Sequence, residues 1–157
     1  MILNVPTQKI LVVDDNPIIL KVLSSAFKAR GYEVFAAVDG PEAFIIVSRE
    51  QPDLILLDIF FPPDLFQSGN TWDAFKIMNW LQRMGGPQAR HISVIIMSGA
   101  DPGEIKDRCL AAGALDYFQK PIQMPELLDA IQQIFCPAVS EVPLELAAIS
   151  NSDSLRL

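Results

Sequence analysis

The sequence is poor in the residues that build disulfide-rich and zinc-binding domains. Its 157 residues include two cysteines, Cys109 and Cys136, and one histidine, His91. Two cysteines without metal-ligand spacing provide neither a disulfide framework nor a structural zinc site. A single histidine leaves little room for histidine-based catalysis.

Basic residues and long apolar runs are also scarce. The chain has 12 Lys and Arg against 19 Asp and Glu, which gives a formal net charge of −7. Nucleic-acid binding relies on clustered cations, so the composition disfavours it. No apolar run is long enough to cross a bilayer, and residues 1–9 lack the basic-then-apolar pattern of a signal peptide. We therefore expect a protein of the reducing cytoplasm without membrane attachment.

Hydrophobic residues make up 50% of the chain, which is enough to form the core of one domain. Short branched apolar runs predict strands buried on both faces, at residues 10–13, 34–37, 54–57, 92–97 and 115–118. Segments with helical spacing follow these runs and begin near Asn16, Gly40, Thr71, Asp101 and Pro125. Repeated strand–helix units require parallel strands and right-handed crossovers. The predicted fold class is α/β, a three-layer doubly wound sandwich with a five-stranded parallel sheet.

The composition changes after the last expected helix. We assign residues 8–136 to one domain and residues 137–157 to a C-terminal tail, which begins with proline and later becomes rich in serine. Chain ends are usually poorly ordered unless they are held down, so a flexible or loosely docked tail is expected. A tail that binds a partner is the alternative.

Polar side chains stand at the ends of four expected strands. Asp14 and Asp15 follow the first strand, Asp58 the third, Ser98 the fourth and Lys120 the fifth. Sites in doubly wound sheets lie beyond the carboxyl ends of the strands, so these side chains should gather at one rim. Crowded carboxylates are stable together when a cation separates them, and a set of oxygen ligands suits Mg²⁺. A carboxylate beside Mg²⁺ can act as a nucleophile toward phosphorus, with an ammonium and a hydroxyl binding the phosphoryl oxygens.

Four segments resemble the receiver domains of two-component response regulators. They are residues 9–15 (KILVVDD), 52–58 (PDLILLD), 95–100 (IIMSGA) and 113–121 (GALDYFQKP). The resemblance covers residues 8–136 and implies a CheY-like, flavodoxin-like sheet with strand order 2-1-3-4-5. It also implies a cis peptide bond between Lys120 and Pro121, which proline tolerates.

The resemblance also implies a phosphoacceptor and a metal site. Asp58 is expected to accept the phosphoryl group. Asp15 is expected to bind Mg²⁺ directly and Asp14 to support it through water, with the backbone carbonyl of Phe60 as a further ligand. Lys120 is expected to bind the phosphate. The family is a regulated phosphoacceptor with weak autophosphatase activity at most, so we do not expect a multiple-turnover enzyme.

Ser98 and Tyr117 match the switch residues of the family. On phosphorylation Ser98 is expected to move toward the phosphoryl group and Tyr117 to fill the vacated space. The face formed by the fourth helix, the fifth strand and the fifth helix would then change its partner preference. The resemblance implies a histidine kinase or a histidine phosphotransfer protein as donor and an unknown downstream protein as recipient. Homodimerisation through the same face rests on family analogy alone.

The loop after Asp58 departs from the family pattern. Residues 59–70 form a longer loop than usual, with Phe60, Phe61 and Phe66 in it. These rings either pack on the following helix or form a docking surface beside the site. Phe60 and Ala100 each lie two residues past a site residue, and neither offers a polar group to orient an attacking water. We therefore expect slow self-dephosphorylation.

Other classes of function fit the residues less well. A phosphorylation-independent interaction module on the same fold is expected to have lost site residues, and none is lost here. An Mg²⁺-dependent phosphohydrolase would need a second Asp at position 60, where Phe60 stands. A flavodoxin-like cofactor carrier needs a phosphate-binding loop after the first strand, where Asp14 and Asp15 would repel phosphate. Residues 137–157 are too few for an effector domain, so a stand-alone receiver and a receiver cut from a larger protein both remain open.

Overall fold

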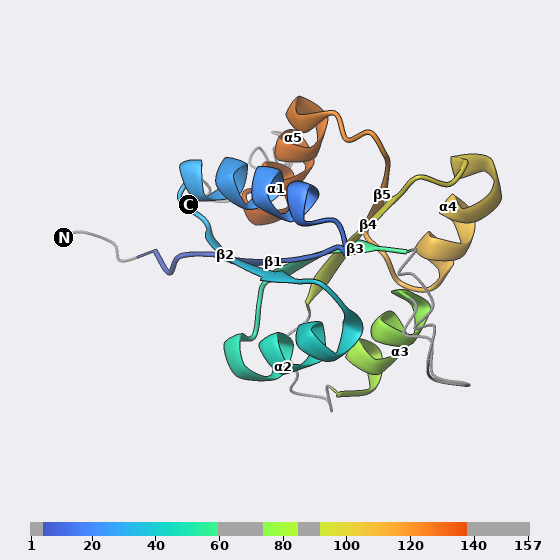
Figure 1. Cartoon of the computed structure of the whole chain (residues 1–157), viewed down its shortest axis with the longest axis horizontal. Coiled ribbons are helices and arrows are strands. Elements are labelled where there is room, and N and C mark those ends of the chain that lie inside the picture. The colour runs from blue at the N-terminus through green and yellow to red at the C-terminus, as the bar shows by residue number, and fades with distance from the viewer. Residues whose placement is uncertain (1–4, 60–73, 85–91, 138–157) are drawn as a thin grey trace, which may run out of the picture. The chain divides into compact units, whose positions relative to one another are not determined.

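The computed structural model describes residues 5–59, 74–84 and 92–137. The chain divides into two compact units, the first ending at Gln123 and the second beginning at Met124. The first unit carries the sheet and the helices that connect its strands (Figure 1). The second contains α5 (Met124–Phe135) within its described residues, where a helix near Pro125 was predicted.

The strands form one parallel sheet in the order β2-β1-β3-β4-β5, as predicted. They are β1 (Lys9–Val13), β2 (Glu33–Ala37), β3 (Leu54–Asp58), β4 (Ser93–Ser98) and β5 (Asp116–Gln119). Every predicted strand agrees with the observed one to within one residue at each end. The side chains of residues 10–13 and 54–57 are fully buried, which confirms strands covered on both faces. Asp58 and Ser98 are the last residues of their strands, so the backbone of the sheet itself positions both side chains.

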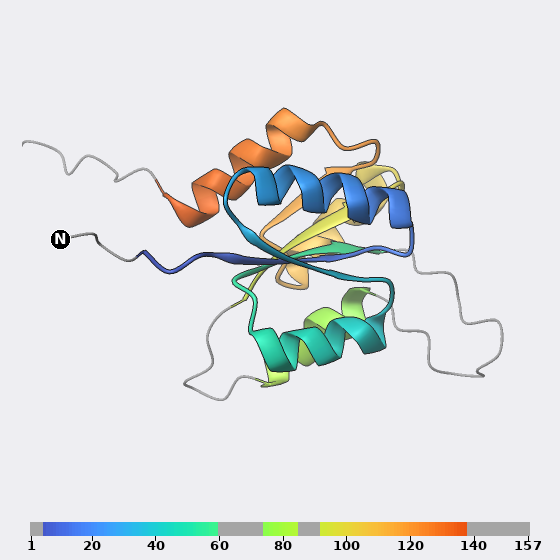
Figure 2. The same ribbon diagram turned by 60° about the vertical axis from the view of Figure 1, so that its left-hand side comes forward.

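Helices cover both faces of the sheet within the first unit. They are α1 (Pro17–Ala29), α2 (Gly40–Glu50), α3 (Ala74–Met84) and α4 (Pro102–Ala111). Figures 1 and 2 show α1 on one face and α2 and α3 on the opposite face. On the α2 and α3 side, Leu57 and Ile96 of the sheet join a buried cluster with Ile46, Ile77 and Met78. These contacts confirm the layered α/β class predicted from the alternation of patterns.

Polar caps start the helices at the carboxyl edge of the sheet. The side chain of Asn16 accepts a hydrogen bond from the N–H of Ile18 at 2.9 Å, with proline at the first helical position, as predicted. Asp39 caps α2 by accepting from the N–H of Glu42 at 2.8 Å, a cap that was not predicted. Asp101 caps α4 in the same way. These three helices, α1, α2 and α4, therefore begin within a few residues of the carboxyl ends of β1, β2 and β4.

Some predictions fall on residues outside the described ranges. They concern the carbonyl of Phe60, the packing of the rings in residues 60–70, the helix start at Thr71 and the tail after Pro137. The cis bond between Lys120 and Pro121 is confirmed. Among the described residues, no helix is both long enough and apolar enough to cross a membrane.

Candidate phosphoacceptor and metal site

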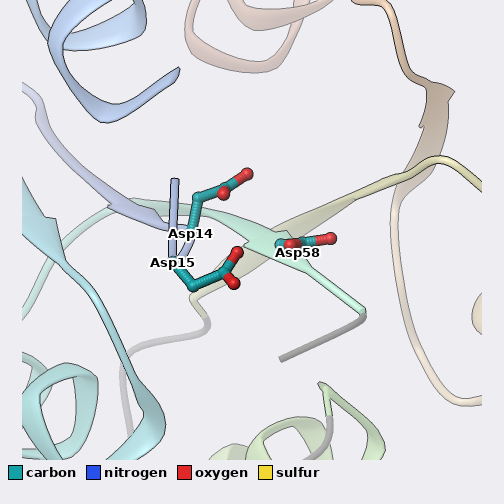
Figure 3. A group of neighbouring side chains, drawn as sticks. All are labelled: Asp14, Asp15 and Asp58. Atoms are coloured by element: carbon teal, nitrogen blue, oxygen red, sulfur yellow. The ribbon is translucent and has the colours of Figure 1, made fainter. Parts of the chain in front are cut away.

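Three carboxylates meet at the carboxyl edge of the sheet. Asp14 and Asp15 follow β1 and Asp58 ends β3, and these neighbouring strands pair in parallel with Val13 opposite Leu57. One oxygen from each of the three carboxylates lies within 4.8 Å of the other two. Figure 3 shows the three side chains extending from the strand ends toward the same side. The predicted gathering of these residues is therefore present in the fold.

The three carboxylates differ in burial and in their partners. Asp14 is fully buried, Asp58 is 4% exposed and Asp15 is exposed. One oxygen of Asp14 accepts from the N–H of Asn16 at 2.8 Å, and the other accepts from the ammonium of Lys120 at 2.5 Å. These bonds offset the cost of burying its charge. Both Asp14 oxygens are thus engaged, whereas Asp15 faces solvent.

Lys120, directly after β5, is the cation of the cluster. Its Nζ lies 2.5 Å from an oxygen of Asp14 and 3.3 Å from an oxygen of Asp58. Burial lowers the pKa of Lys120, but the hydrogen bond to Asp14 and the charge of Asp58 outweigh burial and leave the pKa raised. Lys120 is therefore a cation at neutral pH. Three carboxylates against one ammonium leave two formal negative charges, and an oxygen-only donor set of that charge fits Mg²⁺.

Ser98 and Tyr117 both bind the backbone of Ala100. Ser98 is fully buried at the end of β4, and its Oγ accepts from the N–H of Ala100 at 3.0 Å. Tyr117 on β5 is 6% exposed, and its hydroxyl donates to the carbonyl of Ala100 at 2.9 Å. The backbone N–H of Lys120 donates to the carbonyl of Ser98 at 2.7 Å, which ties β4 to β5 beside the site. The side chains of Ser98 and Tyr117 thus stabilise the observed conformation of the loop between β4 and α4.

Ala100 contributes to the site through its backbone. The sequence indicated only that its side chain is small and nonpolar, whereas its backbone N–H and carbonyl make the contacts in the structure. A backbone contact of this kind leaves no signal in residue type. The side chain of Tyr117 is buried in the structure, and its expected movement into the space vacated by Ser98 stays a prediction.

Comparison with known proteins agrees with this geometry. The family described as response regulator receiver domain matches residues 10–132. Sporulation initiation phosphotransferase F of Bacillus subtilis is 32% identical over 126 residues, covering 80% of this chain and 92% of that protein. Response regulator PleD of Caulobacter vibrioides is 35% identical over 114 residues, covering 73% of this chain but 23% of that protein. The chain therefore spans less than a quarter of the length of PleD.

A solved structure shows the same fold. The chemotaxis protein CheY4 of Vibrio cholerae superposes with a TM-score of 0.69 at 25% identity, covering 82% of this chain and 99% of that one. The family match covers most of the chain, and the acidic cluster typical of receiver domains is present. The chain belongs to the receiver domains of two-component response regulators, a family of phosphoacceptors that are partnered by histidine kinases or phosphotransfer proteins.

Proposed function

We propose that Asp58 accepts a phosphoryl group with the help of Mg²⁺ bound beside it. The observation that carries this proposal is the cluster of Asp14, Asp15 and Asp58 within 4.8 Å, with the ammonium of Lys120 at 3.3 Å from Asp58. Because both oxygens of Asp14 are engaged, Asp15 and Asp58 are the direct ligands and Asp14 acts through water. The carbonyl of Phe60 is the proposed further ligand. When bound, Mg²⁺ neutralises charge on the phosphoryl oxygens.

The residues of the chain supply the remaining steps. An oxygen of Asp58 bonds to phosphorus as the bond from phosphorus to the histidine nitrogen of the donor breaks. Lys120 balances the charge on a second phosphoryl oxygen. Ser98 leaves the N–H of Ala100 and donates its O–H to the phosphoryl group. The ring of Tyr117 fills the space that Ser98 vacates, and the partner preference of the surfaces of α4, β5 and α5 changes.

The setting of this chemistry is part of the same proposal. Residues 8–136 act as the receiver and residues 137–157 as a tail. The donor is a histidine kinase or a histidine phosphotransfer protein. The recipient of the signal is a downstream protein that recognises the phosphorylated state, or a second copy of the chain that forms a homodimer with it. A reducing cytoplasm suits the two cysteines, which are both free.

The phosphoacceptor proposal predicts a mass change. Incubation with a small-molecule phosphodonor and Mg²⁺ should add one phosphoryl group to the chain, measured by intact-protein mass spectrometry. Asp58→Asn removes the nucleophile and should abolish the gain. A chelator should suppress the gain in the wild type because the charge on the phosphoryl oxygens is then poorly balanced.

Asp53→Asn is a matched control because it alters another carboxylate near β3. Its carboxylate accepts from the backbone N–H of Lys9, at the opposite end of the strand from the site. This variant should gain the phosphoryl group as the wild type does. A wild-type chain that binds Mg²⁺ but gains no mass would instead favour the phosphorylation-independent interaction module.

The phosphorylated chain is expected to lose its phosphoryl group slowly, over minutes or longer. Neither Ala100 nor Phe60 carries a polar side chain that orients a water toward phosphorus. Ala100→Gln adds an amide that can do so, while the backbone contacts of residue 100 do not depend on its side chain. We expect this variant to shorten the lifetime about tenfold, or about 1.4 kcal/mol in the barrier. Mass measured at intervals after removal of the donor tests this, and wild-type decay within seconds would contradict it.

A further inference from the structure

Helix α4 is held at its two ends by different sets of contacts. At its N-terminal end, the preceding loop depends on Ser98 and Tyr117, whose side chains bond to the N–H and the carbonyl of Ala100. These are side chains that the proposed function rearranges. The contacts at this end of α4 are therefore sensitive to the state of the site.

The C-terminal end of α4 is closed by its own backbone. The N–H of Gly113 donates to the carbonyl of Leu110, and the N–H of Ala114 donates to the carbonyl of Cys109, both at 3.0 Å. Gly113 has a φ of 105°, the left-handed conformation that this type of helix end requires. The closure leaves the carbonyl of Ala112 without an intrahelical partner, as is usual for the last turn.

A side chain of α3 supplies the missing partner. The amide Nε2 of Gln82 donates to the carbonyl of Ala112 at 2.7 Å. The room for this amide exists because residue 113 is glycine: a Cβ there would lie 2.6 Å from Nε2 of Gln82. The same glycine thus permits the turn and admits the amide from the neighbouring helix.

A second contact lies along the same line between the two helices. The guanidinium of Arg108 lies 5.1 Å from the centre of the Phe75 ring. Phe75 and Gln82 are two helical turns apart on α3. Arg108 on α4 and Ala112, which caps its C-terminal end, are one turn apart, so each pair lies on one side of its helix. Neither contact includes a residue of the phosphoacceptor site.

We propose that Gln82 is a positioning residue that anchors the C-terminal end of α4 to α3. Release of the bonds to Ala100 then swings the N-terminal end of α4 about this anchor instead of displacing the whole helix. The swing rests on the proposed function, because phosphorylation is what releases Ser98. The anchor itself is independent of the proposed function, since the hydrogen bond from Gln82 to Ala112 exists in the unphosphorylated chain.

Amide hydrogen exchange in the unphosphorylated chain tests the anchor. Gln82→Met keeps the length of the side chain but removes the donor, so exchange at Gly113 and Ala114 should become at least about fivefold faster. Gln82→Lys restores a donor that suits a helix C-terminus and should return these amides to within about twofold of the wild type. Asn79→Met, at an exposed position on the same helix, should leave them unchanged. Equal exchange in wild type and Gln82→Met would overturn the proposal.

Tyr117→Phe tests the movable end without any phosphorylation. It removes the hydroxyl that binds the carbonyl of Ala100, and exchange at the Ala100 amide should rise about tenfold. Exchange at the Gly113 and Ala114 amides should stay within about twofold of the wild type while Gln82 is present. Exchange at these two amides should become faster in the double variant with Gln82→Met. Equal acceleration at both ends in Tyr117→Phe alone would contradict a fixed C-terminal end. These outcomes are separate from the mass gain at Asp58, so failure of either proposal is recognised independently.

Discussion

Lys120→Met should lower the stability of the metal-free chain by about 2–3 kcal/mol, and Mg²⁺ should restore most of the loss. In the wild type the ammonium of Lys120 contacts the fully buried carboxylate of Asp14 and the carboxylate of Asp58. Removing one partner of a buried ion pair leaves an uncompensated charge, which costs several kcal/mol. Mg²⁺ then supplies the counter-charge that Lys120 provided, and ligand binding to the folded state stabilises that state. Urea unfolding with and without Mg²⁺ measures both effects.

The same variant should bind Mg²⁺ about tenfold more tightly and gain a phosphoryl group about 100-fold more slowly. Tighter binding follows because an ammonium no longer repels the incoming cation, and a tenfold change corresponds to about 1.4 kcal/mol. Slower transfer follows because one group that balances charge on the phosphoryl oxygens is missing, a loss of the size seen for similar donors. Titration with Mg²⁺ and a time course of intact mass separate the two effects.

Lys106→Met is the matched control, because Lys106 is an exposed lysine on α4. It should leave stability, Mg²⁺ binding and transfer close to the wild type. The pKa of Lys120 is raised from its usual 10.5, so its ion pairs stabilise the fold fully below that pH. Their contribution is lost only as the pH rises through the higher folded value. The difference in stability between wild type and Lys120→Met should therefore persist across neutral pH. A difference confined to acidic solution would argue that the ion pairs of Lys120 are not its cause.

The fold was predictable because its signals are local and repeated. Each strand is a short branched apolar run, and runs such as residues 54–57 are apolar at every position because helices cover both faces of the sheet. Parallel strands place their carboxyl ends at one edge, so residues at strand ends meet even when they are far apart in sequence. That rule alone brings Asp14, Asp58 and Lys120 together, although 106 positions separate the first from the last.

The finer arrangement of the site was not predictable from residue type. Asp14 and Asp15 are adjacent and chemically identical, yet the first is buried between Asn16 and Lys120 and the second is exposed. The distinction comes from how the turn after β1 directs each side chain. Gln82 gives no sequence signal either, since an exposed glutamine on a helix usually contacts only water. Its role emerges only when the carbonyl of Ala112, 30 residues later, comes within hydrogen-bonding distance.

Leu57→Ala should destabilise the domain by about 3 kcal/mol, and by more if the cavity does not collapse. Leu57 is fully buried at the centre of the sheet, with Val13 and Ile96 as its neighbours on the adjacent strands and Asp58 as the next residue. Leu115→Ala makes the same chemical change at a side chain that is 53% exposed, and should cost about 0.5 kcal/mol or less. Urea unfolding measures the free energy of unfolding of both variants. Equal losses of free energy would show that the buried side chain of Leu57 contributes no more to stability than the exposed side chain of Leu115. Below its midpoint of thermal unfolding, Leu57→Ala should still accept a phosphoryl group, because the backbone of β3 continues to position Asp58.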